Sequence, residues 1–475
     1  MKLAYGISDR PGFGKLVVFA IQQLLAIMAA TLVVPIVINN GQVALGNDNP
    51  MMSSAAALFG AGIGTLVYVL FTKRKSPVFL GSSFAFLGSM ASAFAGATSM
   101  ALGYIGLVIG AVFAGLVYVV IAIIVKFVGT SWIDRLMPPV VIGPTVAIIG
   151  LSLAGNAIGD LRTASAGGHT LLAILCGLTT LIVVILCSVF GKKTAKLIPF
   201  IIGILAGYAL AAILTAIGAA TDTEALMITD FSAISGLFKD GVTLKSFVSV
   251  PDFTFITAFK GFADINGAYL GTIAVAYIPV AFVVFAEHIA DHKNISSIVD
   301  KDLLKEPGLS RTLLGDGVGS MAGAFFGGCP NTTYGESIAC VAITGNASVA
   351  TIITAAIGAI LISFLSPFVA FVNTIPSCVM GGVCVALYGF IAVSGLKMIQ
   401  GQNLSDNRNL FVVSTILVSG IGGLSLTFGA ITITSIATAL ILGIIVNLIV
   451  SKRSDKKTVI SGSGNDESKD EQEVA

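Results

Sequence analysis

Long apolar runs follow one another from Leu16 to Val450, and short polar stretches separate them. Most runs approach the roughly 20 residues that a helix needs to cross the hydrocarbon core of a bilayer. The pattern predicts an all-α polytopic membrane protein with 14 membrane elements. Their predicted centres lie near residues 27, 62, 86, 113, 146, 180, 208, 277, 319, 337, 360, 388, 418 and 440. The polar stretch 451–475 has too little apolar surface to fold and is predicted to be a disordered tail.

The composition supports a membrane protein and excludes several other classes. Hydrophobic residues make up 56% of the chain and charged residues 11%, whereas a soluble domain has about 25% charged residues. A net charge of +2 offers no basic surface for nucleic acid. The six cysteines lie in apolar runs without metal-ligand spacing, so we expect free thiols, no metal and no cofactor.

The positive charges predict how the chain is oriented, because lysine and arginine concentrate in cytoplasmic loops. With a cytoplasmic N-terminus (1–15), 22 of the 26 Lys and Arg residues fall on the cytoplasmic side. The tail 451–475 is then cytoplasmic as well, and the longest connection, 219–266, is external. We therefore expect a multi-pass protein of the cell (inner) membrane with both termini in the cytoplasm.

An internal repeat suggests that the two halves of the chain share one architecture. The stretch "PPVVIGPTVAIIGLSLAG" from Pro138 resembles "PSCVMGGVCVALYGFIAVSG" from Pro376, which pairs the fifth predicted element with the twelfth. A repeat of seven spans, an odd number, places the halves in opposite orientations, as in many secondary transporters. The third element, "SPVFLGSSFAFLGSM" from Ser76, then corresponds to the tenth, "GGCPNTTYGESIACVAITG" from Gly327.

The third and tenth elements carry proline, glycine and hydroxyl residues, so neither is expected to form one continuous helix. Such glycine and serine residues also permit close helix packing, which is the plainer explanation. Non-helical backbone at membrane depth is tolerated only where protein or a water-filled cavity satisfies it. Because the two elements correspond and one contains an acid, the pair favours a substrate site at the middle of the membrane.

Few acidic residues lie inside the apolar runs. Glu287 closes the eighth element, and Glu336 follows Pro330 in the tenth. A carboxylate within a span usually faces a cavity and has a function there, although Glu287 could also cap a helix end. Such acids are candidates for proton coupling. Asp291, one helical turn after Glu287, is either a proton relay or a group that meets water at the helix end.

Asp316 is a further intramembrane acid, and the sequence suggests a structural hydrogen-bond acceptor between helices. His288 and His292 adjoin acids, but no third ligand accompanies them, so a metal site is not expected. An intramembrane aspartyl protease would need glycine where Leu313 stands, three residues before Asp316. A channel remains an alternative function, because broken helices are compatible with both channels and carriers.

Several motifs together resemble the nucleobase/ascorbate transporter family, and within it the bacterial members that carry uracil. The resemblance extends from about Ser8 to Val450. It is strongest in "GSSFAF" (81–86), "AEHIADH" (286–292), "DLLKEPGLSRTLLGDG" (302–317), "PNTTYGES" (330–337) and "MGGVCVALYG" (380–389).

This resemblance implies 14 transmembrane segments in two inverted seven-segment repeats, with short strands in segments 3 and 10. It implies a core domain of segments 1–4 and 8–11 (16–128 and 267–373) and a gate domain of segments 5–7 and 12–14 (129–218 and 374–450). It also implies a homodimer and proton-coupled nucleobase uptake by an elevator-like motion of the core against the gate.

The resemblance further implies a set of substrate-binding residues. These are Phe84, Glu287, Tyr334, Gly335, Glu336 and Tyr388, with Glu287, Asp291 and Glu336 as proton-coupling groups. The chain departs from the uracil members at some positions: Asp291 and Gln23 stand where histidine is found, and Ser337 and Ala339 replace Asn and Gly. Purine and ascorbate members usually have Gln in place of Glu336. Uracil is therefore the first expectation, and xanthine or another purine base the alternative.

Overall fold

The structure is a computed structural model that describes residues 3–44, 51–129, 132, 136–239, 241–428 and 431–461. In the first half of the chain the main helices are α1 (Phe13–Ala44), α2 (Ser54–Phe71), α3 (Leu87–Ala95), α4 (Met100–Val128), α6 (Pro139–Ser152), α7 (Ala154–Leu161), α8 (Thr170–Phe190), α9 (Lys193–Leu197) and α10 (Pro199–Thr221). The main helices of the second half are α13 (Gly267–Val299), α14 (Leu309–Gly327), α15 (Gly335–Thr344), α16 (Val349–Ile362), α17 (Ser366–Asn373), α18 (Ser377–Met398), α19 (Asn407–Ile421) and α20 (Ser435–Ser461).

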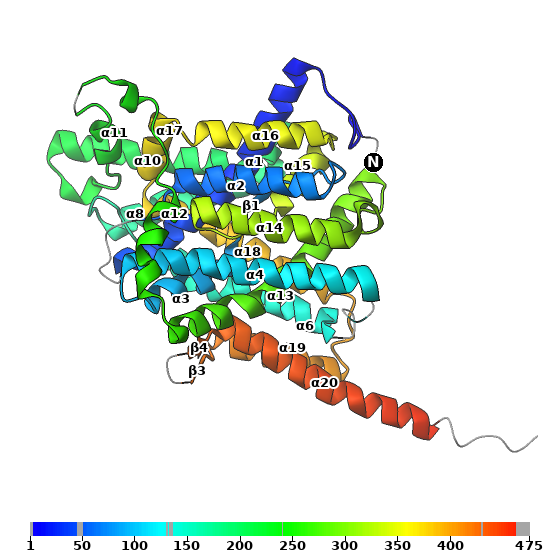
Figure 1. Ribbon diagram of the computed structural model, residues 1–475. Coiled ribbons are helices and arrows are strands. Elements are labelled where there is room, and N and C mark those ends of the chain that lie inside the picture. Colours follow the sequence, from blue (N-terminus) through cyan, green and yellow to red (C-terminus); the bar gives the residue numbers. More distant parts are fainter. Residues whose placement is uncertain are drawn as a thin grey trace, which may run out of the picture.

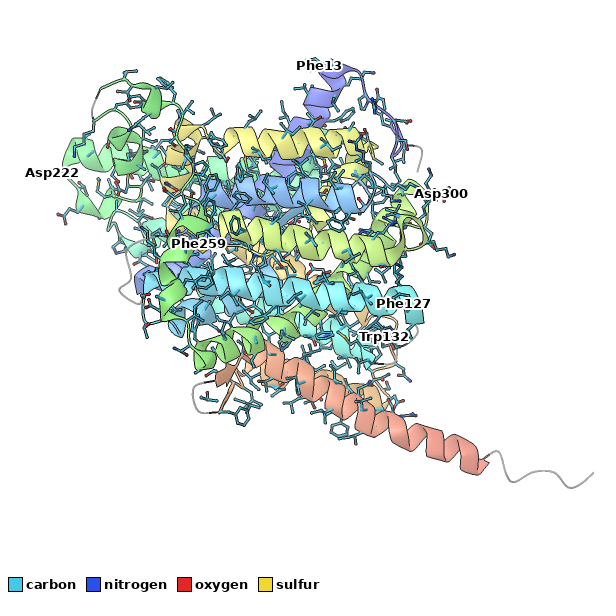
Figure 2. All side chains as sticks on the ribbon, in the orientation of Figure 1. Phe13, Phe127, Trp132, Asp222, Phe259 and Asp300 are labelled. Atoms are coloured by element: carbon cyan, nitrogen blue, oxygen red, sulfur yellow. The ribbon has the colours of Figure 1, made fainter. Side chains whose placement is uncertain are left out.

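A predominantly helical membrane protein is confirmed. Within the described part of the chain, eight helices are long and apolar enough to cross a membrane. All 14 centres predicted from the sequence fall inside helices, although several of these helices are short. Figure 1 shows α16, α2, α14, α4 and α13 lying side by side as one stack. Figure 2 shows Asp222, which follows α10, and Asp300, which follows α13, at opposite ends of the bundle.

The third and tenth predicted elements are each divided into a strand and a short helix. In the third, β1 (Leu80–Ser82) leads through the 3₁₀ turn η1 (Phe84–Phe86) into α3. In the tenth, β2 (Asn331–Thr333) leads into α15. With only 10 residues, α15 is about 15 Å long, half the thickness of a hydrocarbon core. The helical part of each element therefore begins in the interior of the bundle.

Helices from the two halves of the chain pack closely against each other. The two most extensive helix contacts are those between α2 and α14 and between α6 and α18. In the first, Gly60 lies against the backbone of Gly323, and Gly64 against that of Gly319, where an added Cβ would lie 2.7 Å from the Gly319 carbonyl oxygen. Small residues of this kind let helix backbones approach closely in a membrane.

The packing divides the helices into two groups. One contains α1, α2, α3, α4, α13, α14, α15 and α16, and the other contains α6, α8, α10, α18, α19 and α20. Contacts within each group are extensive, whereas those between the groups are few. The fold therefore consists of two separately packed groups of helices with limited contact between them, and the broken elements belong to the first group.

Three regions differ from the elements that the sequence predicts. The segment 219–266 contains the short helices η2 (Glu224–Leu226), α11 (Ser232–Gly236), η3 (Leu244–Ser246), α12 (Thr254–Ala258) and η4 (Phe259–Asp264). A hairpin of β3 (Leu426–Phe428) and β4 (Ile431–Ile433) precedes α20, where no strand was predicted. Helix α20 continues to Ser461, so a disordered tail from residue 451 is wrong for the residues up to 461; residues 462–475 lie outside the described part. The apolar span simply extends as a helix into a polar stretch without proline or glycine before Ser461.

Candidate functional site

Strands β1 and β2 join the two broken elements at the middle of the bundle. They pair antiparallel, with Leu80 opposite Thr333 and Ser82 opposite Asn331. The N–H of Tyr334 extends the ladder by donating to the Phe79 carbonyl at 3.2 Å. The strand pairing supplies hydrogen bonds to backbone N–H and C=O groups that are not part of a helix. At membrane depth such groups must be hydrogen-bonded within the protein.

The side chain of Tyr334 locks this pair of strands. Its hydroxyl donates a hydrogen bond of 2.6 Å to the carbonyl of Ser82. The ring lies so close over Gly81 that a Cβ at that position would overlap it. The Tyr334 hydroxyl is therefore already hydrogen-bonded within the protein, and the groups near Tyr334 that can bind a ligand are those of the backbone.

Each strand leads directly into the first turn of a helix. Turn η1 begins at Phe84, and α15 begins at Gly335. The first N–H groups of a helix have no partner within that helix, and they carry the positive end of its dipole. Two sets of backbone donors therefore begin at one place, from opposite halves of the chain.

A cavity of about 70 Å³ lies where these two helix starts meet. It is lined by Ser83, Phe84, Ala85, Val146, Ile149, Glu287, Thr332, Thr333, Tyr334, Gly335, Glu336 and Ile391. Glu287 comes from α13 and Glu336 from the first turn of α15, so two carboxylates share one small space. Pockets for drug-sized ligands measure about 300–1,000 Å³, so this cavity suits a much smaller molecule. A larger cavity between α3, α13 and Thr432 has no carboxylate in its lining.

Most of the residues expected from the sequence meet at this cavity, but Tyr388 does not line it. Tyr388 lies on α18, and its ring packs edge-on against that of Phe84 with centroids 6.0 Å apart. Phe84 itself lines the cavity. Tyr388 thus contacts the site through another side chain in this structure.

Asp291 also lies behind the cavity. Its carboxylate accepts a hydrogen bond of 2.7 Å from the hydroxyl of Thr333, the last residue of β2. Thr333 itself lines the cavity. Asp291 is thereby joined to the strand that precedes Tyr334, one side chain away from any ligand.

A buried polar network surrounds His288 and His292 on α13. The carboxylate of Asp316 and the Nδ1 atom of His288 are 2.6 Å apart, and Nε2 of His288 is 3.0 Å from the Thr312 hydroxyl. His292 stacks on His288 with ring centroids 4.0 Å apart, and its Nε2 atom is 2.7 Å from the Tyr68 hydroxyl. Asp316 therefore links α14 to α13 as a hydrogen-bond acceptor. Within the described part of the chain, no three potential metal ligands gather into a site.

Gln23 and Ser337 are joined in the structure. The side-chain amide of Gln23, on α1, donates to the Ser337 hydroxyl, which also accepts a hydrogen bond of 3.0 Å from the N–H of Phe79. Ser337 follows Glu336, so this contact fixes the first turn of α15 against α1 and the approach to β1. The sequence showed both residues as departures from a family pattern but did not indicate that they meet.

The apolar walls of the cavity could not be found from the sequence. Val146 and Ile149 come from α6, and Ile391 comes from α18. Each is one aliphatic residue among many in a long apolar run, so nothing distinguishes it. Only the fold shows that these three side chains close the cavity from the second group of helices.

An apolar helical bundle with paired broken elements around a small, acidic interior cavity defines a membrane transport protein. The model of the permease family matches residues 14–429, and the chain belongs to that family. It is a transporter and not an enzyme.

The chain is 37% identical to the uracil permease of Bacillus caldolyticus over 451 residues, covering 94% of each chain. It is 36% identical to the uracil permease of Bacillus subtilis (strain 168), covering 96% of this chain and 97% of that one. Identity to the uracil permease of Escherichia coli (strain K12) is 35%, with 94% of each chain covered.

Solved transporter structures share the fold at low sequence identity. The transmembrane domain of the cyanobacterial bicarbonate transporter BicA matches with a TM-score of 0.56 and 14% identity, covering 93% of this chain and 99% of that one. The murine anion transporter Slc26a9, in its inward-facing state, matches with a TM-score of 0.60 and 10% identity, covering 94% of this chain and 69% of that one. At these identities the likeness concerns the fold alone.

Proposed function

We propose that this permease imports a nucleobase, uracil in the first place, in symport with protons. The observation that carries the proposal is the small cavity in which Glu287, Glu336 and two helix starts converge. Relatives with 35–37% identity over nearly the whole chain are named uracil permeases, which supports the same substrate here. The cavity is the substrate site in this proposal.

The chemistry of the cavity matches that of uracil. The base has ring N–H groups that donate hydrogen bonds and two carbonyl groups that accept them. Glu287 and Glu336 serve as acceptors for the ring N–H groups, and the backbone N–H groups around Phe84 and Gly335 serve as donors to the carbonyls. Phe84 and the aliphatic walls cover the faces of the ring, and Tyr388 supports Phe84 from behind.

The helix contacts support two inverted repeats of seven segments, in which the third and the tenth segments each contribute one strand to the central pair. In such a repeat the contact of α1 with α16 corresponds to that of α13 with α4, and both occur. Likewise α8 with α10 corresponds to α19 with α20, and α18 with α8 corresponds to α6 with α19. The repeat predicted from two short sequence stretches thus extends, in this proposal, to the whole bundle.

The same contacts support a core domain of residues 16–128 and 267–373 and a gate domain of 129–218 and 374–450. The substrate groups belong to the core, and Val146, Ile149 and Ile391 belong to the gate. The sparse contact between the domains suits an elevator-like sliding of the core, because domains with small interfaces move relative to each other.

Two further contacts join the domains at either side of the cavity. The amide of Asn40, at the end of α1, donates a hydrogen bond of 3.0 Å to the carboxylate of Asp160 on α7. Elsewhere Ala26 and Cys340 of the core pack with Leu197 and Ile198 of the gate in a small cluster of their own. In this proposal both contacts separate when the core moves.

Proton coupling is assigned to Glu287, Asp291 and Glu336. Two carboxylates in one enclosed space repel each other when both are ionised, so binding a proton and binding a neutral base are linked. Asp291 exchanges protons with the site through its contact with Thr333. We further propose a homodimer with both termini in the cytoplasm and 219–266 outside, in the inner membrane.

Uptake of labelled uracil into proteoliposomes tests the proposal. Saturable uptake that an inward proton gradient accelerates, and that excess xanthine leaves unchanged, is expected. Competition by xanthine with equal potency would assign the cavity to purine bases. Flux that neither saturates nor responds to the gradient would identify a channel instead.

A further inference from the structure

A second cavity, of about 540 Å³, lies at the end of the bundle where α2 ends and α16 begins. Its lining is formed by Ile7, Ser8, Asp9, Arg10, Lys73, Arg74, Lys75, Val349, Ala350, Ile353 and Thr354. Four of these residues are basic and one is acidic. Nothing in the transport proposal uses this cavity, which belongs to the edge of the core group and not to its interface with the gate.

Hydrogen bonds hold two of the three segments around this cavity together. The chain before α1 lies against the turn between α15 and α16: the N–H of Ala347 donates to the carbonyl of Tyr5 at 2.9 Å, and that of Val349 to Ile7 at 3.1 Å. The hydroxyl of Ser348 donates to the carbonyl of Asp9 at 2.6 Å. These hydrogen bonds fix the N-terminal segment, and therefore Arg10, close to the first turn of α16.

Most of the positive charge in the cavity is not neutralised. Lys75 forms an ion pair with Glu306, and the hydrogen bond and charge of Lys75 lower the pKa of the Glu306 carboxyl below its ordinary value. Asp9 accepts a hydrogen bond of 2.7 Å from the N–H of Gly6. Among the described residues, no ion pair joins Arg10, Lys73 or Arg74 to an acid.

Two of these basic residues have a strained backbone conformation. Lys73 and Arg74 have φ values of 52° and 59°, in the left-handed region that favours glycine. Glycine would make the same turn with less strain, but it would remove the charge. The first turn of α16 adds the positive end of a helix dipole to the same cavity, through Val349 and Ala350.

An apolar track leads from the cavity along α16. Ile353 lies in the wall, and Ile357 and Leu361 follow at intervals of four residues, on one face of the helix. The exposed fractions of Ile357 and Leu361 are 45% and 63%. Figure 1 shows α16 at the edge of the bundle in that view, beside α2. A basic cavity that continues into an exposed apolar stripe fits a phosphate group attached to long acyl chains.

We propose that this cavity binds the phosphate headgroup of an anionic phospholipid, with one acyl chain lying along Ile353, Ile357 and Leu361. Arg10, Lys73 and Arg74 contact the phosphate, and Lys75 is held aside by Glu306. Basic pockets at the boundary of membrane helices bind such headgroups through charge. A free phosphate ion would use the same charges but would gain nothing from the stripe.

Native mass spectrometry of the purified full-length permease tests the assignment, with dioleoyl phosphatidylglycerol as the probe. The variant carries Arg10→Gln, Lys73→Gln and Arg74→Gln together. We expect its affinity for one tightly retained lipid to fall by about a hundredfold, since each of the three basic residues near an anionic headgroup contributes roughly a fivefold factor. A matched control carries Lys192→Gln, Lys196→Gln and Lys397→Gln, which are exposed basic residues elsewhere, and should retain the lipid.

Three comparisons complete the experiment. Arg10→Lys, Lys73→Arg and Arg74→Lys together should retain the lipid, because the charge is preserved. Dioleoyl phosphatidylcholine should be retained less than phosphatidylglycerol, and inorganic phosphate should not displace the bound lipid. Unchanged retention in the glutamine variant would overturn the site, and displacement by inorganic phosphate would overturn the assignment to a lipid. Uracil binding by the glutamine variant, measured in detergent, shows that it is folded.

Discussion

The Thr333 hydroxyl and the Asp291 carboxylate are joined by a hydrogen bond of 2.7 Å that connects β2 to α13. Thr333 lines the cavity that we propose as the substrate site, whereas Asp291 is not part of its lining. In the proposed mechanism, a change in the protonation of Asp291 would reach the site through the strand that precedes Tyr334 and Gly335. This geometry separates a role in coupling from a role in binding.

Substitution of Asp291 by Asn is expected to spare exchange of internal for external uracil and to abolish the acceleration of uptake by a proton gradient. Asn keeps an oxygen that accepts from Thr333 but cannot carry a proton. Both activities are measured in the same proteoliposomes. Thr333→Val is the matched variant, because it removes the hydrogen bond and leaves the acid. Equal loss of exchange and of driven uptake in Asp291→Asn would assign Asp291 to the structure alone.

Substitution of Glu336 by Gln is expected to weaken uracil binding by about 1.5–3 kcal/mol, or roughly 10- to 150-fold, measured by calorimetry. The amide must place two donors in an enclosed cavity that was built around an acceptor. Glu306→Gln changes an exposed acid in the same way and should bind like the wild type. Binding by Glu336→Gln within about twofold of the wild type would remove this residue from the site.

Substitution of Asp316 by Ala is expected to lower thermal stability, because it leaves the Nδ1 atom of the fully buried His288 ring without its hydrogen-bond partner. An unsatisfied buried polar group costs about 1–3 kcal/mol. Asp316→Asn should lose less, since its amide oxygen still accepts from the His288 ring. Melting temperatures in detergent check both variants, with Asp302→Ala on the surface as the control. An Ala variant as stable as the wild type would contradict this role.

Cysteine labelling is expected to place Ser235 and Lys301 on opposite sides of the membrane. The two positions are exposed and flank α13, and the positive charges assign Lys301 to the cytoplasm. The background has all six native cysteines replaced. An impermeant thiol reagent added to intact cells should modify Ser235→Cys, and Lys301→Cys only after the membrane is opened. The opposite pattern would invert the orientation.

The sequence predicted the helical elements well because a membrane span needs a long apolar run, which is visible without any knowledge of partners. It also indicated where the helices break, since Pro330 and the glycines around it are local signals. The hairpin of β3 and β4 escaped prediction because its apolar residues, such as Phe428, continue the pattern of the neighbouring spans. Charged residues end the apolar run before α20 ends, so the sequence did not indicate that the helix continues to Ser461.

The candidate site was only partly predictable for a different reason. Acidic residues are rare inside apolar runs, so Glu287 and Glu336 could each be identified from the sequence without knowing their neighbours. The pairing of His288 with Asp316, or of Gln23 with Ser337, depends on which helices are neighbours, and no local pattern encodes that. Tyr388 packs against Phe84 and does not line the cavity, and the sequence does not indicate this contact between α18 and η1.

The pairing of β1 with β2 also dictates an order of events while the protein is being made. Leu80 leaves the ribosome long before its partner Thr333 exists, and until then β1 carries open amide and carbonyl groups that hydrocarbon does not accept. The segment around Leu80 must therefore wait in a hydrated or chaperoned state while most later helices insert. A nascent chain that stops short of Asn331 contains most of the membrane helices but has no place to hold a substrate.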